Sequence, residues 1–456
     1  MPGRKWQEIL ALSHRRGALP MPEAATLPGW PPDPIWTSAP STLSTVLPAT
    51  PVGRQLEWVC DAATRRPIGT AELQAHVAQP LLERDDLDAL LCRLAGASVD
   101  SYRAQPRSAN RQAYALLGGV GRPKYHLRID TDAAGRIAGL DLTPVPNSWP
   151  EIGDRLRALA PRASFLAAEI DAAGRVRPVY GVAPSTPRPI GSAIFLYVLG
   201  ALAHAVGQGR ASWNEPLAVR DAWKADLRSP VGAVPDGAML TLRQYADDAI
   251  FYGDSSAIDH LLGRLGRGAV EAQQVRFGHA QVGANLPFLT TREMTQLKLA
   301  DYPRLGQGYV ATDGPRAKLG YLRDVVARLP LPTVESWPVA GEPRFADSVE
   351  WFAAPADVTR AFLGLSRQAA ELPAVGDVLA QQGTAALGLD AGRWPVGWSM
   401  GGAEPGVVSE NFLAKTAGRT FVVSMMVSDP QRPLDLAATR AGLLSAGAGA
   451  FELLAR

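Results

Sequence analysis

The sequence predicts an α/β (α+β) protein in which a small domain precedes a larger one. Two observations support this fold class. Helical patterns are followed by strand patterns between residues 51 and 146. Residues 147–456 begin with a helix and two strands, continue through a long helical stretch and end with three strands and a helix. Elements arranged in this order are typical of a sheet with helices on its faces.

The small domain is predicted to follow a proline-rich arm. Residues 20–51 contain many prolines and few periodic apolar positions, so residues 1–50 are expected to form either an extended arm or lid, or a disordered tail. A helical pattern then runs from Val52 to Leu94. Strands are predicted at Tyr125–Asp130 and Ile137–Leu142, and a DAAGR turn joins them as a hairpin. These elements place the small α+β domain at residues 51–146.

The larger domain is predicted over residues 147–456. It begins with a helix near Trp149–Leu159, and a mostly helical region spans residues 192–389. A final helix closes the chain. The predicted strands are Ser164–Ile170, Val176–Val182, Val396–Met400, Val408–Thr416 and Phe421–Val427.

Composition and charge exclude several classes of function. The net charge is +2, from 46 Lys and Arg against 44 Asp and Glu, which gives no electrostatic reason to expect a nucleic-acid or acidic-membrane partner. Two cysteines, Cys60 and Cys92, are too few for a disulfide framework, and no Cys/His spacing indicates a metal site. The most apolar run, Ala193–Val206, is shorter than the ~18 residues that a membrane span needs. We therefore expect a cytoplasmic protein without metal or cofactor.

Ser192 is the leading candidate for a catalytic nucleophile. It follows Pro189 and Gly191 and stands at the start of a strongly apolar helical segment. Unpaired backbone N–H groups and the dipole at a helix N-terminus favour an anion, as the oxyanion of acyl transfer requires. The alternative is that Ser192 only caps the helix, which is a common role of serine.

Three segments, in order, resemble the motifs of serine β-lactamases and penicillin-binding proteins. The marks of that superfamily are S-x-x-K, S-D-N and K-T-G or K-G-G. The corresponding segments here are GSAIFLYVLGALAHAV from Gly191, YGDSSAIDHLLGRLG from Tyr252, and VGWSMGGAEPGV from Val396. The resemblance extends from Phe165 to the C-terminus. It implies a class A β-lactamase-like domain, with helices on both faces of a sheet and a helical subdomain.

The motif positions that usually handle protons are changed. Phe195 stands where the first lysine is expected, Gly253 replaces the serine of S-D-N, and Met400 replaces the lysine of the third motif. Because a serine hydroxyl needs a base to become a good nucleophile, ordinary β-lactamase activity is not expected. We predict an apolar, reshaped pocket instead. Its predicted substrate-binding residues are Phe195, Gly253, Ser255, Trp398, Ser399, Met400, Gly401 and Gly402.

A substitute base would have to come from another residue. The predicted catalytic set is Ser192, Tyr252 and Asp254, because Tyr252-Gly253-Asp254 loosely resembles the Y-x-N motif of some relatives. The register that aligns Gly253 with the missing serine is preferred, and Asp254 is alternatively a buried capping carboxylate. Lys415 precedes a hairpin turn, so it is treated as a false K-T-G match. Other candidates, each with a structural alternative, are His260, Glu350 and Glu404.

The whole chain resembles the two-domain β-lactamase-fold proteins of clavulanic acid gene clusters and related actinobacterial serine hydrolases. This resemblance starts at TPVGRQLEWVCDAA, from Thr50, and continues to the end of the chain. It implies a small domain like the ketosteroid-isomerase/NTF2 module. It also implies weak esterase activity on acylated β-lactam nuclei and a role in specialised metabolism, but the missing lysines do not support the esterase activity here.

Three hypotheses follow for the function. The first is a biosynthetic enzyme that acts on an apolar small-molecule intermediate, by cyclisation, isomerisation or Ser192-dependent hydrolysis. The second is a non-catalytic protein that binds and sequesters a hydrophobic metabolite. The third places an active site in the small domain, where His76 or His126 would act. The oligomeric state is left open.

Overall fold

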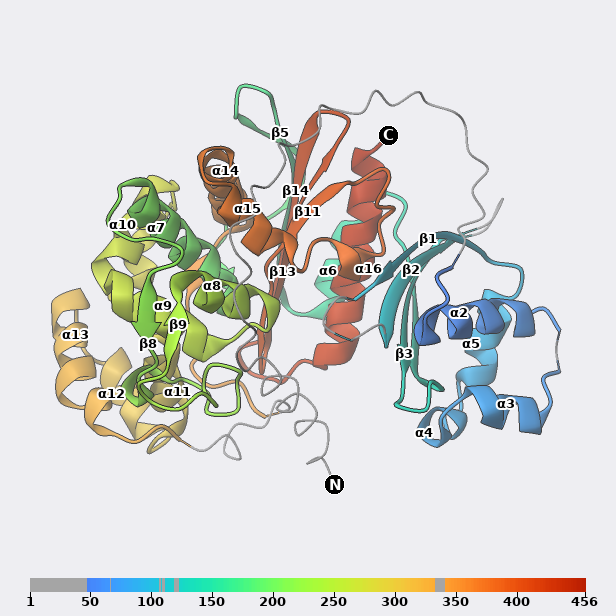
Figure 1. The fold of residues 1–456 in the computed structure, drawn as a ribbon, viewed down its shortest axis with the longest axis horizontal. Coiled ribbons are helices and arrows are strands. Elements are labelled where there is room, and N and C mark those ends of the chain that lie inside the picture. Colours follow the sequence, from blue (N-terminus) through green and yellow to red (C-terminus); the bar gives the residue numbers. More distant parts are fainter. Residues whose placement is uncertain (1–46, 66, 106–107, 109–110, 119–122, 333–340) are drawn as a thin grey trace, which may run out of the picture. The chain divides into compact units, whose positions relative to one another are not determined.

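The computed structural model describes residues 47–65, 67–105, 108, 111–118, 123–332 and 341–456 (Figure 1). Most of the arm predicted at residues 1–50 therefore lies outside the described residues. The described residues all belong to one compact unit, and the domain boundary predicted at residue 146 falls between a strand and a helix of that unit. The described part of the chain contains no helix with the length and apolar character needed to cross a membrane.

The small domain packs four helices on one face of an antiparallel sheet. The helices are α2 (Pro51–Ala62), α3 (Thr70–His76), α4 (Gln79–Leu82) and α5 (Leu87–Leu94). The sheet, as described, has the order β1 (Ser98–Ala104), β2 (Gln112–Gly118), β3 (Tyr125–Thr131), β4 (Ile137–Pro144). The predicted hairpin β3–β4 is confirmed.

Strands β1 and β2 were not predicted, and for β2 its burial on both faces explains why. Ala113, Ala115 and Leu117 point into the core of the small domain, whereas Tyr114 and Leu116 pack into the core of the large domain. A strand buried on both faces has an almost continuous apolar run, so the alternation that identifies half-buried strands is missing.

Both DAAGR turns form as predicted. In the first, Asp132 Oδ1 accepts hydrogen bonds from the backbone N–H of Ala134 and Arg136, each at 2.9 Å, and Gly135 has φ +80°. Asp171 and Gly174 repeat this arrangement in the second turn. A short polar side chain and a glycine with positive φ are the usual requirements of such turns.

The large domain is built on an antiparallel sheet. The described strands run in the order β11 (Val396–Ser399), β13 (Val407–Thr416), β14 (Arg419–Ser428), β5 (Arg162–Ile170), β6 (Val176–Val182). A short strand, β12 (Gly402–Glu404), also pairs with β13. Strands β11 and β12 are therefore two halves of one edge strand, interrupted at Met400–Gly401.

Helices cover both faces of this sheet (Figure 1). Helix α6 (Trp149–Leu159), at the bounds predicted, packs with α16 (Leu436–Leu454) on one face. Helix α14 (Pro355–Glu371) packs on β14 and β5 from the other face. Alternate residues of β14 enter the two cores: Val423 and Met425 face α16, whereas Val422 and Met426 face the helical region.

The region between β6 and β11 is mostly helical, as predicted. Short two-stranded pairs join β7 (Arg188–Pro189) to β10 (Phe352–Ala353) and β8 (Pro216–Ala218) to β9 (Met239–Thr241). The α-helices of this region, besides α14, are α7 (Phe195–Gly207), α8 (Leu242–Phe251), α9 (Ser255–Leu265), α10 (Arg267–Arg276), α11 (Thr291–Leu299), α12 (Arg304–Val310), α13 (Pro315–Asp324) and α15 (Pro373–Ala380). The 3₁₀ turns are η2 (Gly191–Ile194), η3 (Asp221–Trp223), η4 (Val282–Asn285), η5 (Val326–Arg328) and η7 (Ala385–Leu387).

Candidate active site

Ser192 lies in the 3₁₀ turn η2, immediately before the buried helix α7. The chain enters this turn through Gly191, whose φ of +51° strongly favours glycine. Ser192 is half-buried, and its Oγ atom has no hydrogen-bond partner among the described residues. The structure thus presents the predicted serine at a helix start without a base bound to it.

Strand β12 runs directly against this turn. A Cβ atom on Gly402 would stand 2.5 Å from the backbone nitrogen of Ser192, so the position requires glycine. A Cβ atom on Gly191 would stand 3.4 Å from the backbone nitrogen of Ala403. Ser409 Oγ donates a 2.8 Å hydrogen bond to Ile190 O and fastens the turn to β13. Gly402 therefore lies directly against the turn of Ser192, and its role in binding a substrate stays a prediction.

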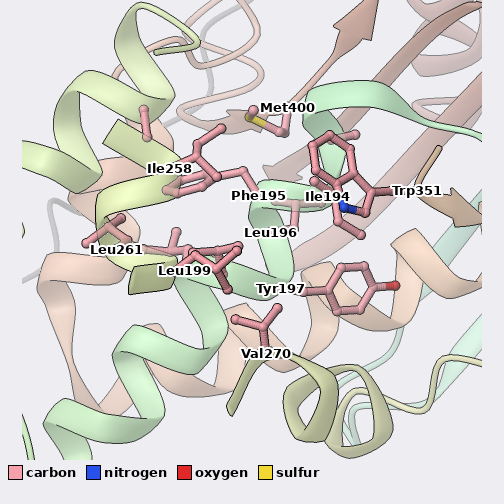
Figure 2. Close-up of a cluster of buried hydrophobic side chains, with 14 of the residues drawn as sticks. Ile194, Phe195, Leu196, Tyr197, Leu199, Ile258, Leu261, Val270, Trp351 and Met400 are labelled. Atoms are coloured by element: carbon pink, nitrogen blue, oxygen red, sulfur yellow. The ribbon is translucent and has the colours of Figure 1, made fainter. Parts of the chain in front are cut away.

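Phe195 and Met400 do not line an open pocket. Phe195 is 0% exposed and Met400 2% exposed, and both belong to the large hydrophobic core. Figure 2 shows the two side chains close together within a packed cluster that includes Ile258. The prediction that these residues form an apolar substrate pocket needs correction, because bulky side chains at both lysine positions fill the space instead of lining it.

The residues that follow α8 end that helix and cap the next one. Tyr252 is 48% exposed, and its ring packs edge-on against Phe251, with ring centroids 4.8 Å apart. Gly253, with φ +65°, ends the helix. Asp254 caps α9 by accepting from the N–H groups of Ser256 and Ala257, and Ser255 is the first residue of that helix. This arrangement corresponds to the alternative role considered for Asp254, a buried capping carboxylate.

Two residues outside α9 also donate hydrogen bonds to Asp254. Ser229 Oγ donates to its Oδ1 at 2.8 Å, and Val231 N–H donates to its Oδ2 at 2.7 Å. Burial raises the pKa of Asp254, while these donors oppose the shift. With its acceptor atoms used in this way, the carboxylate has a structural role.

The candidate His260 and the false K-T-G match Lys415 also have structural contacts. His260 is 0% exposed, donates from Nδ1 to Ser256 O and accepts at Nε2 from Arg220 N–H. Lys415 lies over the ring of Trp398, 5.6 Å from its centroid, on the neighbouring strand. Trp398 and Ser399 are buried, at 3% and 6% exposure. Each of these side chains has a packing or hydrogen-bonding partner of its own, and their grouping around Ser192 stays a prediction.

Asn411 holds the edge strand where it breaks. Met400 N–H donates to Asn411 O, and Asn411 Nδ2 donates to Met400 O, both at 3.0 Å. Ser424 Oγ in turn donates to Asn411 Oδ1 at 2.6 Å. This contact positions Gly401 and Gly402 after the break. The prediction overlooked Asn411, a polar residue directly before the apolar FLA segment. The structure shows that its side chain is fully buried, where its amide must find hydrogen-bond partners.

A buried charge cluster joins the two remaining candidates. Lys298 Nζ donates to Glu350 Oε1 at 2.5 Å and to both carboxylate oxygens of Glu404, at 2.6 and 2.7 Å. The side chains of Lys298 and Glu350 are 2% and 0% exposed. Burial and the adjacent Glu350 carboxylate hold the pKa of Glu404 well above its ordinary value. The cluster therefore sets the single ammonium of Lys298 between two buried carboxyl groups.

This cluster connects the segments on both sides of Ser192. Glu350 precedes Trp351, whose carbonyl accepts the N–H of Ile190, and Glu404 belongs to β12. Although burial disfavours its charge, the two carboxylates raise the pKa of Lys298, so the ammonium stays protonated. A protonated lysine cannot accept a proton from a serine. The Lys298 cluster therefore holds together the two segments that flank the turn of Ser192, which is a structural role.

The described residues contain no group of three or more His, Cys, Asp or Glu side chains that could hold a metal ion.

The third hypothesis concerned histidines of the small domain. His76 stacks on Trp58, with ring centroids 4.2 Å apart, and its Nδ1 donates a hydrogen bond to Gln55 Oε1 at 3.0 Å. His126 is buried, and its Nε2 donates to Ala386 O at 2.8 Å, which joins the small domain to the large one.

Two family models match parts of the chain. Residues 160–312 match the beta-lactamase enzyme family, and residues 47–137 match the family described as ORF 12 gene product N-terminal. No curated protein matches the sequence. The first match supports a mixed α/β fold of the serine beta-lactamase and penicillin-binding-protein type for the large domain. The small domain matches a family of its own, and its likeness to the NTF2 module stays a prediction.

Solved structures give a coarser comparison. The beta-lactamase from Sphaerobacter thermophilus is 18% identical, and the similarity covers 66% of this chain and 96% of that chain with a TM-score of 0.44. An ancestral class A beta-lactamase is 17% identical, with coverage of 67% and 99% and a TM-score of 0.48. PBP-A is 16% identical, with coverage of 68% and 98% and a TM-score of 0.43.

Proposed function

We propose that this beta-lactamase-fold protein binds a small molecule and does not form an acyl-enzyme at Ser192. The observation that carries the proposal is the complete burial of Phe195 at the position where the motif requires a lysine. Ser192 Oγ meets no base within the described residues. An unactivated serine hydroxyl is a weak nucleophile, so acyl transfer would lack its first step.

The other titratable residues near the motifs support the same proposal. The ammonium of Lys298 is held by two carboxylates and stays protonated. The carboxylate of Asp254 is used in capping α9. The phenol of Tyr252 belongs to a half-exposed side chain that packs on its neighbour Phe251. Each residue has a contact that accounts for it without proton transfer from Ser192.

The proposal includes a role in bacterial specialised metabolism. The ligand would be a hydrophobic or amphipathic intermediate, which the protein either sequesters or guides through a step without hydrolysis, such as cyclisation or isomerisation. The proposed role in specialised metabolism comes from the resemblance of the whole two-domain chain. The match of residues 47–137 to the ORF 12 gene product N-terminal family supports that role for the first of the two domains. A fold alone does not fix a function, so the ligand has to be found by experiment.

A second candidate function is Ser192-dependent acyl transfer. The observation in its favour is the approach of β12 to the turn. The backbone nitrogens of Ser192 and Ala403 lie on facing segments, and this close approach requires glycine at residue 402. Paired backbone N–H groups beside a serine are the elements of an oxyanion hole.

Hydrolysis of p-nitrophenyl acetate and of a chromogenic cephalosporin separates the two functions. The native protein is compared with Ser192→Ala, and with Tyr252→Phe as a control for the alternative base. We expect native protein and Ser192→Ala to show the same background rate. A native rate about 100-fold or more above that of Ser192→Ala would contradict the proposal, because that is the size of a general-base contribution.

A further inference from the structure

A large cavity lies between the small domain and the large domain, away from the packed core around Phe195. Its volume is about 540 Å³. This size is within the range of about 300–1,000 Å³ that is usual for small-molecule sites, which often occur between domains. Strands β2, β3 and β4 form one wall, and the first half of α16 with β12 and β13 forms the other.

The two walls differ in chemistry. The wall from the large domain presents mainly small apolar side chains, among them Val408, Ala437, Ala441 and Leu444. The wall from the small domain presents polar side chains, namely Gln112, Tyr114, Arg128, Asp141 and Thr143. A molecule that fills this space must therefore have one apolar side and one polar side.

Most charges on the polar wall satisfy one another. Asp130 accepts from Gln112 Nε2 at 2.6 Å and pairs with Arg128 Nη2 at 2.6 Å. Arg128 Nη1 also donates to Asp141 Oδ2 at 3.3 Å. These groups form a closed network and offer little free charge to a ligand.

Arg440 is different, because only part of its guanidinium is used. Its Nε donates to Glu410 Oε1 at 2.7 Å, while its two terminal nitrogens have no partner among the described residues. Two terminal nitrogens of one guanidinium match the two oxygens of a carboxylate. The cavity thus offers an unused donor pair.

We propose that this cavity binds a small amphipathic carboxylic acid. Its carboxylate pairs with the terminal nitrogens of Arg440, and its apolar side lies on α16. This inference rests on the proposed function and names the site and the ligand class that the function needs. Ala403 lines the cavity and follows Gly402, which contacts the turn of Ser192, so β12 separates the ligand from the serine.

Two fluorescent probes test the site. 8-Anilinonaphthalene-1-sulfonate has a pair of apolar ring systems and an anionic sulfonate that stands in for the carboxylate, and N-phenyl-1-naphthylamine has the same rings without the anion. Fluorescence titrations of the native protein are compared with those of Ala437→Trp, which fills the cavity, and Arg440→Gln, which removes the charged guanidinium. Ala438→Trp is the matched control, because Ala438 is exposed on the same helical turn and does not line the cavity. Thermal melting shows that each variant is folded.

The expected pattern is specific to the cavity. Ala437→Trp weakens both probes by about tenfold or more because the indole takes their space, and Ala438→Trp changes neither. Arg440→Gln weakens the sulfonate by about tenfold, the size expected for a charge-assisted hydrogen bond, and leaves the uncharged probe unchanged. Equal binding by Ala437→Trp and Ala438→Trp would overturn the site, and equal weakening of both probes by Arg440→Gln would overturn the ligand class. Ester hydrolysis at Ser192 is measured separately, so failure of the proposed function is distinguishable from failure of this site.

Discussion

Replacing Phe195 with alanine should lower the free energy of unfolding by about 3–5 kcal/mol, the usual cost of removing a fully buried phenyl ring. The side chain is 0% exposed and packs in the core with Ile258 and Met400 (Figure 2). The loss combines the transfer free energy of the ring with the cavity that it leaves, since a close-packed core collapses only in part.

The assay is equilibrium unfolding in urea, followed by tryptophan fluorescence and evaluated at constant slope. Phe195→Leu nearly preserves the volume and should lose less than about 1.5 kcal/mol. Tyr252→Ala removes an aromatic ring from a side chain that is 48% exposed and should change stability by about 0.5 kcal/mol or less. A loss below about 1 kcal/mol for Phe195→Ala would show that the ring lines open space and would refute the packed site.

Two further predictions concern buried charge. Lys298→Met should cost about 3–5 kcal/mol at neutral pH because it leaves Glu350 and Glu404 buried without their cation, and adding Glu350→Gln with Glu404→Gln should recover most of that loss in urea unfolding. Burial lowers the pKa of His126 to about 4, whereas the pKa of a histidine in an unfolded chain is about 6.5. As the pH drops from 6.5 to 4, the unfolded state binds a proton that the folded state does not, so the free energy of unfolding falls. The difference in stability between native protein and His126→Leu should shrink by about 3 kcal/mol over that window, and a constant difference would contradict the low pKa.

Local chemistry made much of the fold predictable. The DAAGR turns form because an aspartate and a glycine at fixed offsets satisfy the turn by themselves. Helix α6 begins at Trp149, after Ser148, whose side chain caps it, and Pro150 stands in its first turn. These signals lie within a few residues of the structure that they determine, so sequence reading finds them.

The buried charge cluster depends on contacts that no local pattern contains. Lys298 lies in a helix of ordinary amphipathic appearance, and its partners Glu350 and Glu404 are 52 and 106 residues away in the sequence. Both glutamates were candidates from the sequence, but the lysine that joins them was not. The tertiary fold alone decides that an apparently ordinary surface lysine is 2% exposed.

The pocket prediction failed for a related reason. The motif alignment singled out Phe195 and Met400, which lie in the same core cluster, but it did not show how much room they occupy. Two bulky side chains that replace lysines can either line a cavity or fill it, and the choice depends on the surrounding volume. The cavity between the domains was likewise invisible, because Gln105, Tyr114 and Arg440 come from distant segments.

The most direct test of the central claim is intact-protein mass spectrometry after incubation with a fluorophosphonate. The native chain is compared with Ser192→Ala under the same conditions, and an activated ester serves as a second probe. Because Ser192 Oγ has no base among the described residues, the native chain should gain no mass that Ser192→Ala does not also gain. A mass gain of one probe adduct in the native chain alone would show an activated serine and would contradict the claim.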